Sequence, residues 1–535
     1  ARKLFDEMQN YDVVSSAALL SGYAQKGKTE DAKRLLSKIR ESGFELNDVA
    51  WNGLIAGFNR SKKYGDAIMA FKEMHSAGVE IGGVSISSVL PSVGYAGILN
   101  MGDQIHCHVV KRGMKNCNWV GSALIDMYGR CSTCMEIQKV FEEMNTVDVV
   151  ACNAFLTGLA RMGSVNVALQ KFREFQHQGF NLNIVSWTSV ISACSQNGND
   201  AEALEIFREM QDQGEKPNEV TITSVLPACG NISALKQGMS IHGFSIRSGI
   251  LHDIHVDSSL VDMYAKCGRM HFSRRCFERM IAKNKVSWNA IINGYSMHGE
   301  YKEAVDLFDL MKKNGLKPDA ITFTSLLSVC AHCGLYDEGI HFFNSMSRDY
   351  GIDARMEHYA SMVNLLGRCG RLLEAYAMIN EMPFEADGCV WGSFLNACRV
   401  HRNIELGVEA AEKLFALEPE NPGNYVLLAN LYASKGMWEE ANKIRDKLVS
   451  TSLSKNPGCS WIELNNEIYT LLSGDNSRPE MLQINEKLGN LNDEMKNSEN
   501  SDAFNDVERQ DVSSVLGLLQ AANLSCKDYE DAWLS

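Results

Sequence analysis

One stretch of the sequence, residues 184–218, returns along the chain at intervals of slightly more than thirty residues. Aligned on it, further copies open at Val13, Asp48, Gly83, Asn118, Val149, Glu219, Ile254, Lys285, Ala320 and Met356. Near the end of most copies, Phe and Met stand three residues apart, as at Phe207 and Met210, a spacing that places both on one face of a helix. Two short helices cannot bury such a face alone, so the copies must stack around a continuous core.

Each copy predicts a pair of antiparallel helices. The first helix ends where a glycine recurs at the offset of a left-handed C-terminal cap: Gly27, Gly97, Gly163, Gly198, Gly268, Gly299, Gly334 and Gly370. The expected fold is an all-α, right-handed solenoid of helix-turn-helix repeats over residues 13–387. Phe5 and Met8 already fit the end of a repeat, which predicts a truncated repeat at 1–12 and a native N-terminus upstream of Ala1.

Charge and hydropathy narrow the function classes. No stretch is apolar for long enough to span a bilayer, so no membrane partner is expected. The net charge is -14, and from Asp475 onward 13 acidic residues face 5 basic ones, so the acidity lies largely in the tail. This balance argues against binding driven mainly by phosphate neutralisation. It does not argue against reading bases inside a groove.

The cysteines recur at fixed offsets in the repeats, which favours packing over metal binding. One offset holds Cys194, Cys229, Cys330 and Cys398, and another holds Cys131, Cys267 and Cys369. The CxxC pairs at Cys131/Cys134 and Cys330/Cys333 have no second pair or His partner at zinc spacing. We therefore expect neither a metal site nor a cofactor, and reduced thiols suit an intracellular or organellar compartment.

Three phrases carry a family resemblance: LVDMYAKCG at 260–268, SWNAII at 287–292 and VLPAC at 225–229. With its long, long, short order of repeats, the chain resembles the pentatricopeptide repeat family of land plants, in the subclass that alternates P, L and S motifs. The resemblance implies a mitochondrial or chloroplast protein, whose transit peptide would lie outside this sequence.

The region after Asp387 is similar to the C-terminal motifs of the same family. Segments at 391–395, 417–421 and 425–432 look like E motifs, expected over 388–455, and 456–461 resembles the box that follows them, within an extension at 456–489. Such extensions imply a factor that selects cytidines for conversion to uridine in organelle transcripts.

The chemistry of a cytidine deaminase is absent from this sequence. Many relatives end in a deaminase-like domain that needs H-x-E and CxxC ligands for zinc. Residues 502–508 and 515–519 look like remnants flanking the H-x-E, without its His and Glu, and only Cys526 follows. We therefore expect no catalytic residue in this chain, a disordered or remnant tail at 490–535, and a DYW-type deaminase and other editing factors recruited in trans through 388–461.

Recognition should lie on the first helices, where two offsets carry short polar groups. Pentatricopeptide repeats read one base per repeat with two or three side chains. The predicted base-reading residues are Asn52, Ser122, Asp148, Asn153, Asn183, Thr188, Asn218, Thr223, Asp253, Ser258, Asn284, Asn289 and Asp319. The predicted base-stacking residues are Val49, Val150, Val185, Val220 and Val286.

By resemblance to the family, an amide at the fifth residue of a repeat favours pyrimidines and a hydroxyl favours purines. Asp as the last residue then favours U or G, and Asn favours A or C. The pairs from Ser122/Asp148 to Asn289/Asp319 imply a target core G-C-A-(G)-A-U, with the L-motif pair Thr223/Asp253 in parentheses. Pairs at the margins, such as Asn52 with Gly82, depart from the rule and leave the flanks undefined.

Two alternatives stay open at this point. Asn, Ser, Thr and Asp at these offsets are also ordinary helix caps and turn residues. A helical solenoid can also bind peptides along its concave face, which would make the chain a protein-binding scaffold. An RNA processing or stability factor without a role in editing is a further reading.

Overall fold

The computed structural model describes residues 13–41, 46–114, 117–131, 134–450, 459–464 and 467–472. The predicted truncated repeat at 1–12 and the tail at 490–535, with its deaminase-like remnants, lie outside these residues. Of the predicted extension at 456–489, the description covers only the two short strands.

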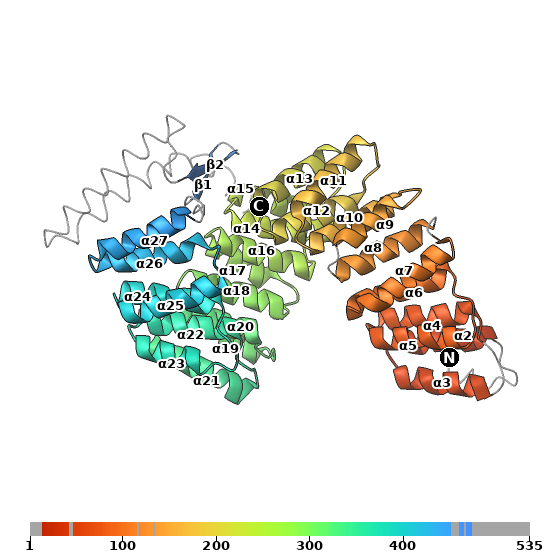
Figure 1. Cartoon of the computed structure of the whole chain (residues 1–535), viewed down its shortest axis with the longest axis horizontal. Helices are drawn as coiled ribbons and strands as arrows, with labels where there is room; N and C mark the ends of the chain where they lie inside the picture. The colour runs from red at the N-terminus through yellow and green to blue at the C-terminus, as the bar shows by residue number, and fades with distance from the viewer. Residues whose placement is uncertain are drawn as a thin grey trace. The chain divides into compact units, whose positions relative to one another are not determined.

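Helices follow one another in pairs along the described chain (Figure 1). The first helices of the pairs are α2 (Val13–Gln25), α4 (Asp48–Arg60), α6 (Gly83–Ala96), α8 (Asn118–Arg130), α10 (Val149–Arg161), α12 (Ile184–Gln196), α14 (Glu219–Asn231), α16 (Ile254–Lys266), α18 (Lys285–Met297), α20 (Ala320–Cys333), α22 (Met356–Arg368), α24 (Gly388–Val400) and α26 (Pro422–Ser434). The second helices are α3 (Thr29–Glu41), α5 (Tyr64–Ser76), α7 (Leu99–Lys111), α9 (Cys134–Glu142), α11 (Val165–His177), α13 (Asp200–Asp212), α15 (Leu235–Arg247), α17 (Met270–Arg279), α19 (Tyr301–Lys313), α21 (Tyr336–Tyr350), α23 (Leu372–Asn380), α25 (Ile404–Leu417) and α27 (Trp438–Ser450).

The predicted repeat openings coincide with the starts of the first helices, from Val13 in α2 to Met356 in α22. The prediction of an all-α repeat solenoid is confirmed. A two-stranded antiparallel hairpin, β1 (Cys459–Leu464) and β2 (Glu467–Leu472), follows the last helix pair and was not predicted.

Glycines with left-handed backbone end the first helices, as predicted. All eight glycines at this offset have positive φ, from 65° at Gly97 to 77° at Gly198. Lys62, Ser233 and Arg402 occupy the same offset in other repeats with φ of 59°, 55° and 54°, a conformation that costs energy for a residue with a Cβ.

The described helices fall into two compact units, one reaching to Asn231 together with Ile241–Ser259, the other comprising Ile232–Ser240 and the chain from Leu260 onward. Within the first unit, α8 packs against α10 and α10 against α12. Within the second, α18 packs against α20 and α20 against α22. Each unit therefore places its first helices side by side.

The Phe and Met side chains of the second helices form the shared core. Phe207 and Met210 in the first unit are buried, as are Phe308 and Met311 in the second. Phe172 lies edge-on to Trp187 of the next repeat, with ring centroids 4.8 Å apart. Because each repeat completes the core of its neighbour, the first helices within each unit stand in a fixed register.

None of the helices that the structure describes combines the length and the apolar character needed to cross a membrane.

Candidate nucleic-acid interface

The last residue of a repeat caps the first helix of the next one. Asp148 accepts a hydrogen bond from Ala151 N at 2.8 Å, and Asp319 accepts one from Thr322 N at 3.1 Å. The remaining members of the set make the same bond: Asn183 with Ser186 N, Asn218 with Thr221 N, Asp253 with Val256 N, and Asn284 with Ser287 N. These residues are therefore true N-caps, which fixes the position of their second polar atom.

Two of the predicted reading pairs are joined directly by a hydrogen bond. Asn153 Nδ2 donates to Asn183 Oδ1 at 3.2 Å, and Asn289 Nδ2 donates to Asp319 Oδ1 at 3.0 Å. The two residues of each pair stand 30 positions apart in the sequence. The fold thus brings the fifth and last residues of a repeat into one polar pair.

A third residue, which sequence reasoning missed, completes these pairs. It is the third residue of the following repeat, a buried hydroxyl that belongs to the same cap. Ser186 donates to Asn153 Oδ1 at 2.5 Å, and Thr322 donates to Asn289 Oδ1 at 2.6 Å. Serine or threonine at this offset was the signal that could have found it.

The pair Thr188/Asn218 is joined through the same third residue rather than directly. The hydroxyls of Thr188 and Thr221 lie 2.7 Å apart, and Thr221 also hydrogen-bonds Asn218 Oδ1 at 2.9 Å. In this repeat the reading residue and the cap share one hydroxyl between them.

The other predicted fifth residues do not join their partners in this way. The hydroxyls of Thr223 and Ser258 donate to Val220 O and Ile254 O of their own helices. Ser122 Oγ is buried and has no hydrogen-bond partner among the described residues, while Asp148 Oδ2 accepts from Asn118 Nδ2 at 3.4 Å. The paired arrangement is a property of particular repeats.

Asn52 belongs to a repeat whose cap residue has no side chain, so no cap oxygen is present to accept a hydrogen bond from its amide. Its last-residue partner is Gly82, which caps α6 with its backbone alone. Within the described part of the chain, Asn52 Oδ1 is buried without a hydrogen-bond partner.

A row of exposed apolar side chains runs beside the polar pairs. All five predicted stacking residues are exposed, from 51% for Val185 to 67% for Val49. The structure adds Val84, Trp119 and Ile321 at the same offset, all exposed by 58% or more. Exposed apolar side chains are unremarkable singly, but one recurs at this offset in six consecutive repeats of the first unit, from Val49 to Val220, and in two of the second, at Val286 and Ile321. These side chains are defined here as the apolar row. At the same offset, the repeats that open at Ile254 and Met356 carry the polar residues His255 and Glu357.

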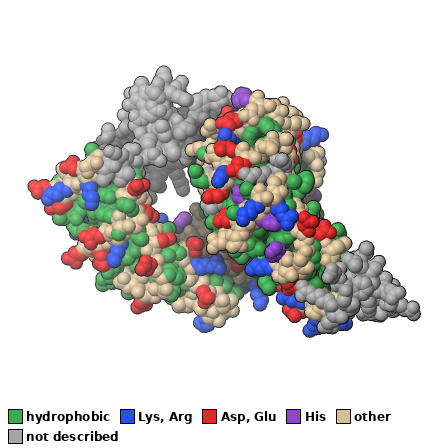
Figure 2. Space-filling model, turned by 45° about the vertical axis from the view of Figure 1, so that its right-hand side comes forward, with side chains coloured by type: hydrophobic (Ala, Val, Ile, Leu, Met, Phe, Trp, Pro, Cys, Tyr) green, Lys and Arg blue, Asp and Glu red, His purple; other side chains and the backbone are tan. Residues whose placement is uncertain are grey.

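The surface carries no segregated charge on the face shown in Figure 2. Basic and acidic side chains alternate over its described parts, and hydrophobic side chains lie between them. Several of the charges pair between repeats, as Arg161 does with Asp126 at 2.7 Å. The described parts of this face therefore carry no large area of charge of one sign.

The cysteines of one recurring offset pack in the core, whereas those of the other offset, Cys131, Cys267 and Cys369, are only half-buried. Cys194, Cys229, Cys330 and Cys398 are buried, and burial raises the pKa of Cys194, Cys330 and Cys398 to about 12. These thiols are neutral at pH 7. Among the described residues, no group of three or more His, Cys, Asp and Glu side chains could hold a metal ion.

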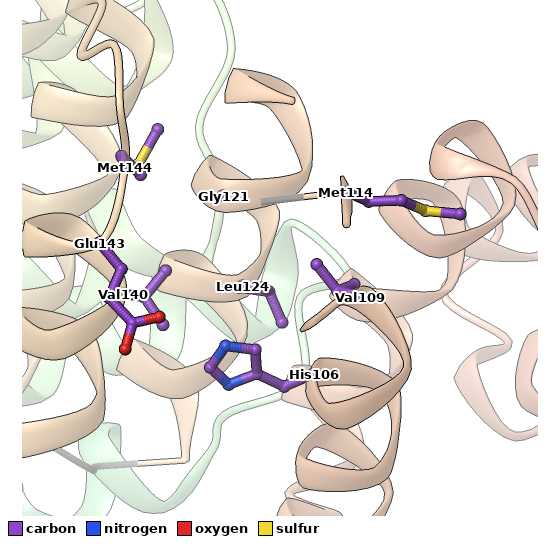
Figure 3. Close-up of a pocket in the computed structure, with 8 residues that line it drawn as sticks. All are labelled: His106, Val109, Met114, Gly121, Leu124, Val140, Glu143 and Met144. Atoms are coloured by element: carbon purple, nitrogen blue, oxygen red, sulfur yellow. The ribbon is translucent and has the colours of Figure 1, made fainter. Parts of the chain in front are cut away.

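A small hollow lies between α7, α8 and α9 (Figure 3). His106 and Val109 of α7 face Leu124 of α8 across it. The imidazole of His106 is held in place, because His106 Nδ1 lies 3.0 Å from Tyr128 Oη, which donates to Asp103 Oδ1 at 2.9 Å. This hollow offers no row of large anchors of the kind that a peptide-binding groove needs.

Comparison with known families finds repeats along the chain. The model described as "PPR repeat" matches residues 14–44, 49–79, 258–284, 321–350 and 357–385. The "PPR repeat family" model matches 283–332, the "Pentatricopeptide repeat domain" model matches 170–232, and an "E motif" model matches 401–463.

Relatives with similar sequences come from Arabidopsis thaliana. One pentatricopeptide repeat-containing protein is 52% identical, over 96% of this chain and 68% of its own length. A mitochondrial one is 34% identical over 93% of this chain and 53% of its own length. The chloroplastic protein CRR2 is 35% identical over 92% of this chain and 70% of its own length. The chain therefore spans 53 to 70% of the length of these three relatives.

Among solved structures, the maize pentatricopeptide repeat protein PPR10 is similar with a TM-score of 0.40 and 18% identity, over 84% of this chain and 81% of that one. Its complex with an 18-nucleotide psaJ RNA element gives a TM-score of 0.39 and 17% identity, over 85% of this chain and 78% of that one.

Proposed function

This chain belongs to the pentatricopeptide repeat family, and from that premise we propose that it binds single-stranded RNA in a plant organelle and reads its sequence. The observation that carries the proposal is the recurrence of apolar-row side chains at one offset, with hydrogen-bonded polar pairs at Asn153/Asn183 and Asn289/Asp319. Repeats of this family read one base each with two or three side chains. The organelle would be the mitochondrion or the chloroplast.

The repeats that contain Asn153 and Asn289 each offer the two contacts that a base needs. A valine of the apolar row, such as Val150 or Val286, presents an exposed methyl surface to a base face. Asn153 and Asn289 lie three residues further along the same helices, and each keeps one amide N–H and one oxygen lone pair after its hydrogen bonds within the protein. One donor beside one acceptor matches the Watson–Crick edge of a pyrimidine.

The proposed target core is G-C-A-(G)-A-U, read with the N-terminus toward the RNA 5′ end. Direct hydrogen bonds support the pairs that would read C and U, Asn153/Asn183 and Asn289/Asp319. The bridge through Thr221 supports the pair that would read the first A, Thr188/Asn218. The remaining positions rest on the family rule alone.

A finer proposal is that the chain selects cytidines for editing to uridine. The match to an E motif at 401–463 supports it, and a deaminase would then be recruited in trans through 388–461. The purified chain should contain no stoichiometric zinc and should not convert cytidine to uridine in RNA by itself. Activity of the chain alone would contradict this, whereas activity that appears only with an added deaminase would support recruitment.

The test of RNA reading starts from a random RNA pool. Sequences that contain G-C-A-(G)-A-U should be enriched on the immobilised protein. If proteins bind and no RNA is enriched, the chain is a scaffold; if RNA binds and no editing partner does, a role in RNA processing or stability replaces the editing proposal.

The sharpest variant is Asn289→Thr, which changes the last joined pair from an amide to a hydroxyl. By the family rule the preference at its nucleotide should shift from U to G. A mismatched base at this position should cost on the order of 1 to 3 kcal/mol, by analogy with base-edge discrimination in DNA. A gel-shift competition with an unchanged preference for U would show that Asn289 acts only in folding.

A further inference from the structure

We propose that the buried hydroxyl at the third residue of a repeat positions the base-reading amide of the preceding repeat. Ser186 acts in this way on Asn153, and Thr322 acts on Asn289. The inference rests on the proposed reading of RNA and assigns a specificity-determining role to residues that cannot themselves touch RNA, because Ser186 and Thr322 are both 0% exposed.

The donors and acceptors around Asn289 allow only one orientation of its amide. Asp319 has a carboxylate, which accepts hydrogen bonds and cannot donate them. The amide atom that faces Asp319 Oδ1 at 3.0 Å must therefore be the nitrogen of Asn289. Oδ1 of the amide then faces Thr322, whose hydroxyl donates to it at 2.6 Å.

The amide of Asn153 is oriented by the same logic although its partner is an amide. Asn183 Oδ1 accepts from the backbone N–H groups of Val185 and Ser186, at 3.1 and 3.3 Å, and so must be an oxygen. Asn153 therefore presents its nitrogen to Asn183 and its oxygen to the hydroxyl of Ser186. The start of one helix thus sets the polarity of the amide in the helix before it.

A fixed polarity matters because a free amide can turn over. Rotation by half a turn exchanges the donor and the acceptor that the base meets. The cap oxygen holds the nitrogen side of the amide, and the hydroxyl holds the oxygen side, so the turned orientation would lose both hydrogen bonds. The edge left for the base is then constant, and discrimination at that nucleotide does not include the cost of ordering the amide.

Two repeats of the same chain lack either the third-residue hydroxyl or the cap side chain. The residue equivalent to Ser186 after Ser122 is Ala151, and Ser122 Oγ is buried with no partner in the described structure. The cap residue after Asn52 is Gly82, and Asn52 Oδ1 is likewise buried and unpartnered there. Both the cap side chain and the third-residue hydroxyl are needed to hold the fifth residue.

The test measures base preference at one nucleotide, which a merely structural residue would not alter. Thr322→Val removes the hydroxyl and keeps the shape of the side chain. The ratio of the Kd for RNA with C to the Kd for RNA with U at the last core position should fall about 10-fold. A bidentate contact to a base discriminates by about this factor. The ratios at the other nucleotides should stay unchanged.

A second pair of variants keeps the test independent of the stability of one helix. Ser186→Ala should lower discrimination at the C position in the same way, and Ser186→Thr, which keeps a hydroxyl, should restore it. Ser287→Ala is the matched control, because Ser287 is also buried in a capping box. The fifth residue before it is Ser258, which donates to its own helix at Ile254 O. This control should lower Tm without changing any base preference.

The outcomes separate the two proposals. If the wild type enriches no RNA, the proposed function fails before this test begins. If RNA binds with the expected preference while Thr322→Val and Ser186→Ala both leave the Kd ratios unchanged, the positioning role is wrong. Equal loss of preference in Ser287→Ala would also overturn it, because cap loss alone would then explain the effect.

Discussion

At the scale of single residues, Asp319 shows how one side chain serves folding and recognition together. Its Oδ1 accepts from the backbone of its own helix at Thr322 N and from the amide of Asn289 in the repeat before. The alternative that these residues are ordinary caps is therefore correct as chemistry, and it does not compete with base reading. The cap is what holds the proposed reading edge in place.

The exchange Asp319→Asn should separate these two roles. Asn and Asp are nearly equal as N-caps, so the free energy of unfolding should change by less than about 0.5 kcal/mol. By the family rule, the preference at the last core nucleotide should move from U to C. Thermal unfolding and competition binding would measure the two effects on one sample.

Asp319→Ala is the control for that exchange. It removes the cap oxygen and should cost about 1 kcal/mol of stability, together with the preference for U. A large loss of stability in Asp319→Asn, or an unchanged preference in Asp319→Ala, would show that the roles are not divided in this way.

The polar pairs could be foreseen from repeat offsets, but their hydrogen bonds could not. Ser186 lies 33 positions from Asn153, and a serine three residues after an Asn cap predicts only a local capping box. The second bond of that hydroxyl exists because stacking brings neighbouring first helices together. Ser122, whose Oγ has no partner in the described structure, differs from the bonded Thr188 through the next repeat, where Ala151 stands at the offset that Thr221 fills for Thr188.

At the scale of elements, the helix starts were predictable because the period, the caps and the glycines all indicate the same boundaries. The hairpin β1–β2 lies in the segment that resembles the extension after the E motifs, and that resemblance does not itself predict strands. Two six-residue segments separated by two residues, Asn465 and Asn466, form the strands. A two-residue link is a hairpin spacing, but neither residue is the glycine that usually marks such a turn in a sequence.

Non-glycine residues with left-handed backbone at the ends of the first helices should limit the stability of the protein. Lys62 and Arg402 are exposed and hold φ of 59° and 54°, where other repeats have glycine. Lys62→Gly and Arg402→Gly should each stabilise the protein by about 0.5 to 1 kcal/mol, because glycine enters this region without steric cost. Chemical denaturation would measure the gain.

The reverse change at Gly299 supplies the control. Its φ is 70° and nothing lies within 4 Å of an added Cβ, so Gly299→Ala tests the backbone term alone. It should destabilise by about 1 kcal/mol. A neutral Gly299→Ala, or a destabilising Arg402→Gly, would mean that this offset does not limit the stability of a repeat.

At the scale of the whole molecule, the charge predicts how RNA binding should respond to salt. The chain carries -14, and on the face seen in Figure 2 its charges are mixed in sign. Proteins that neutralise about 6 to 10 phosphates lose roughly 10³ to 10⁵ in affinity between 50 and 200 mM salt. Here we expect a loss below about 10², because base contacts rather than phosphate contacts should dominate.

Fluorescence anisotropy across a salt series would measure this slope. A non-cognate RNA of equal length is the control, since it reports the phosphate contribution without base reading. A steep slope shared by both RNAs would mean that the basic side chains act as a phosphate track, and that the apolar row and polar pairs contribute little to affinity.

The dual use of the cap residue has an evolutionary consequence. Asn and Asp codons differ by a single nucleotide, and the two residues cap a helix about equally well. Under the proposed function, one point mutation at a cap such as Asn183 or Asp319 changes the preferred letter of the transcript while the repeat keeps its stability. A lineage of such proteins can follow a drifting target one letter at a time, through intermediates that all fold.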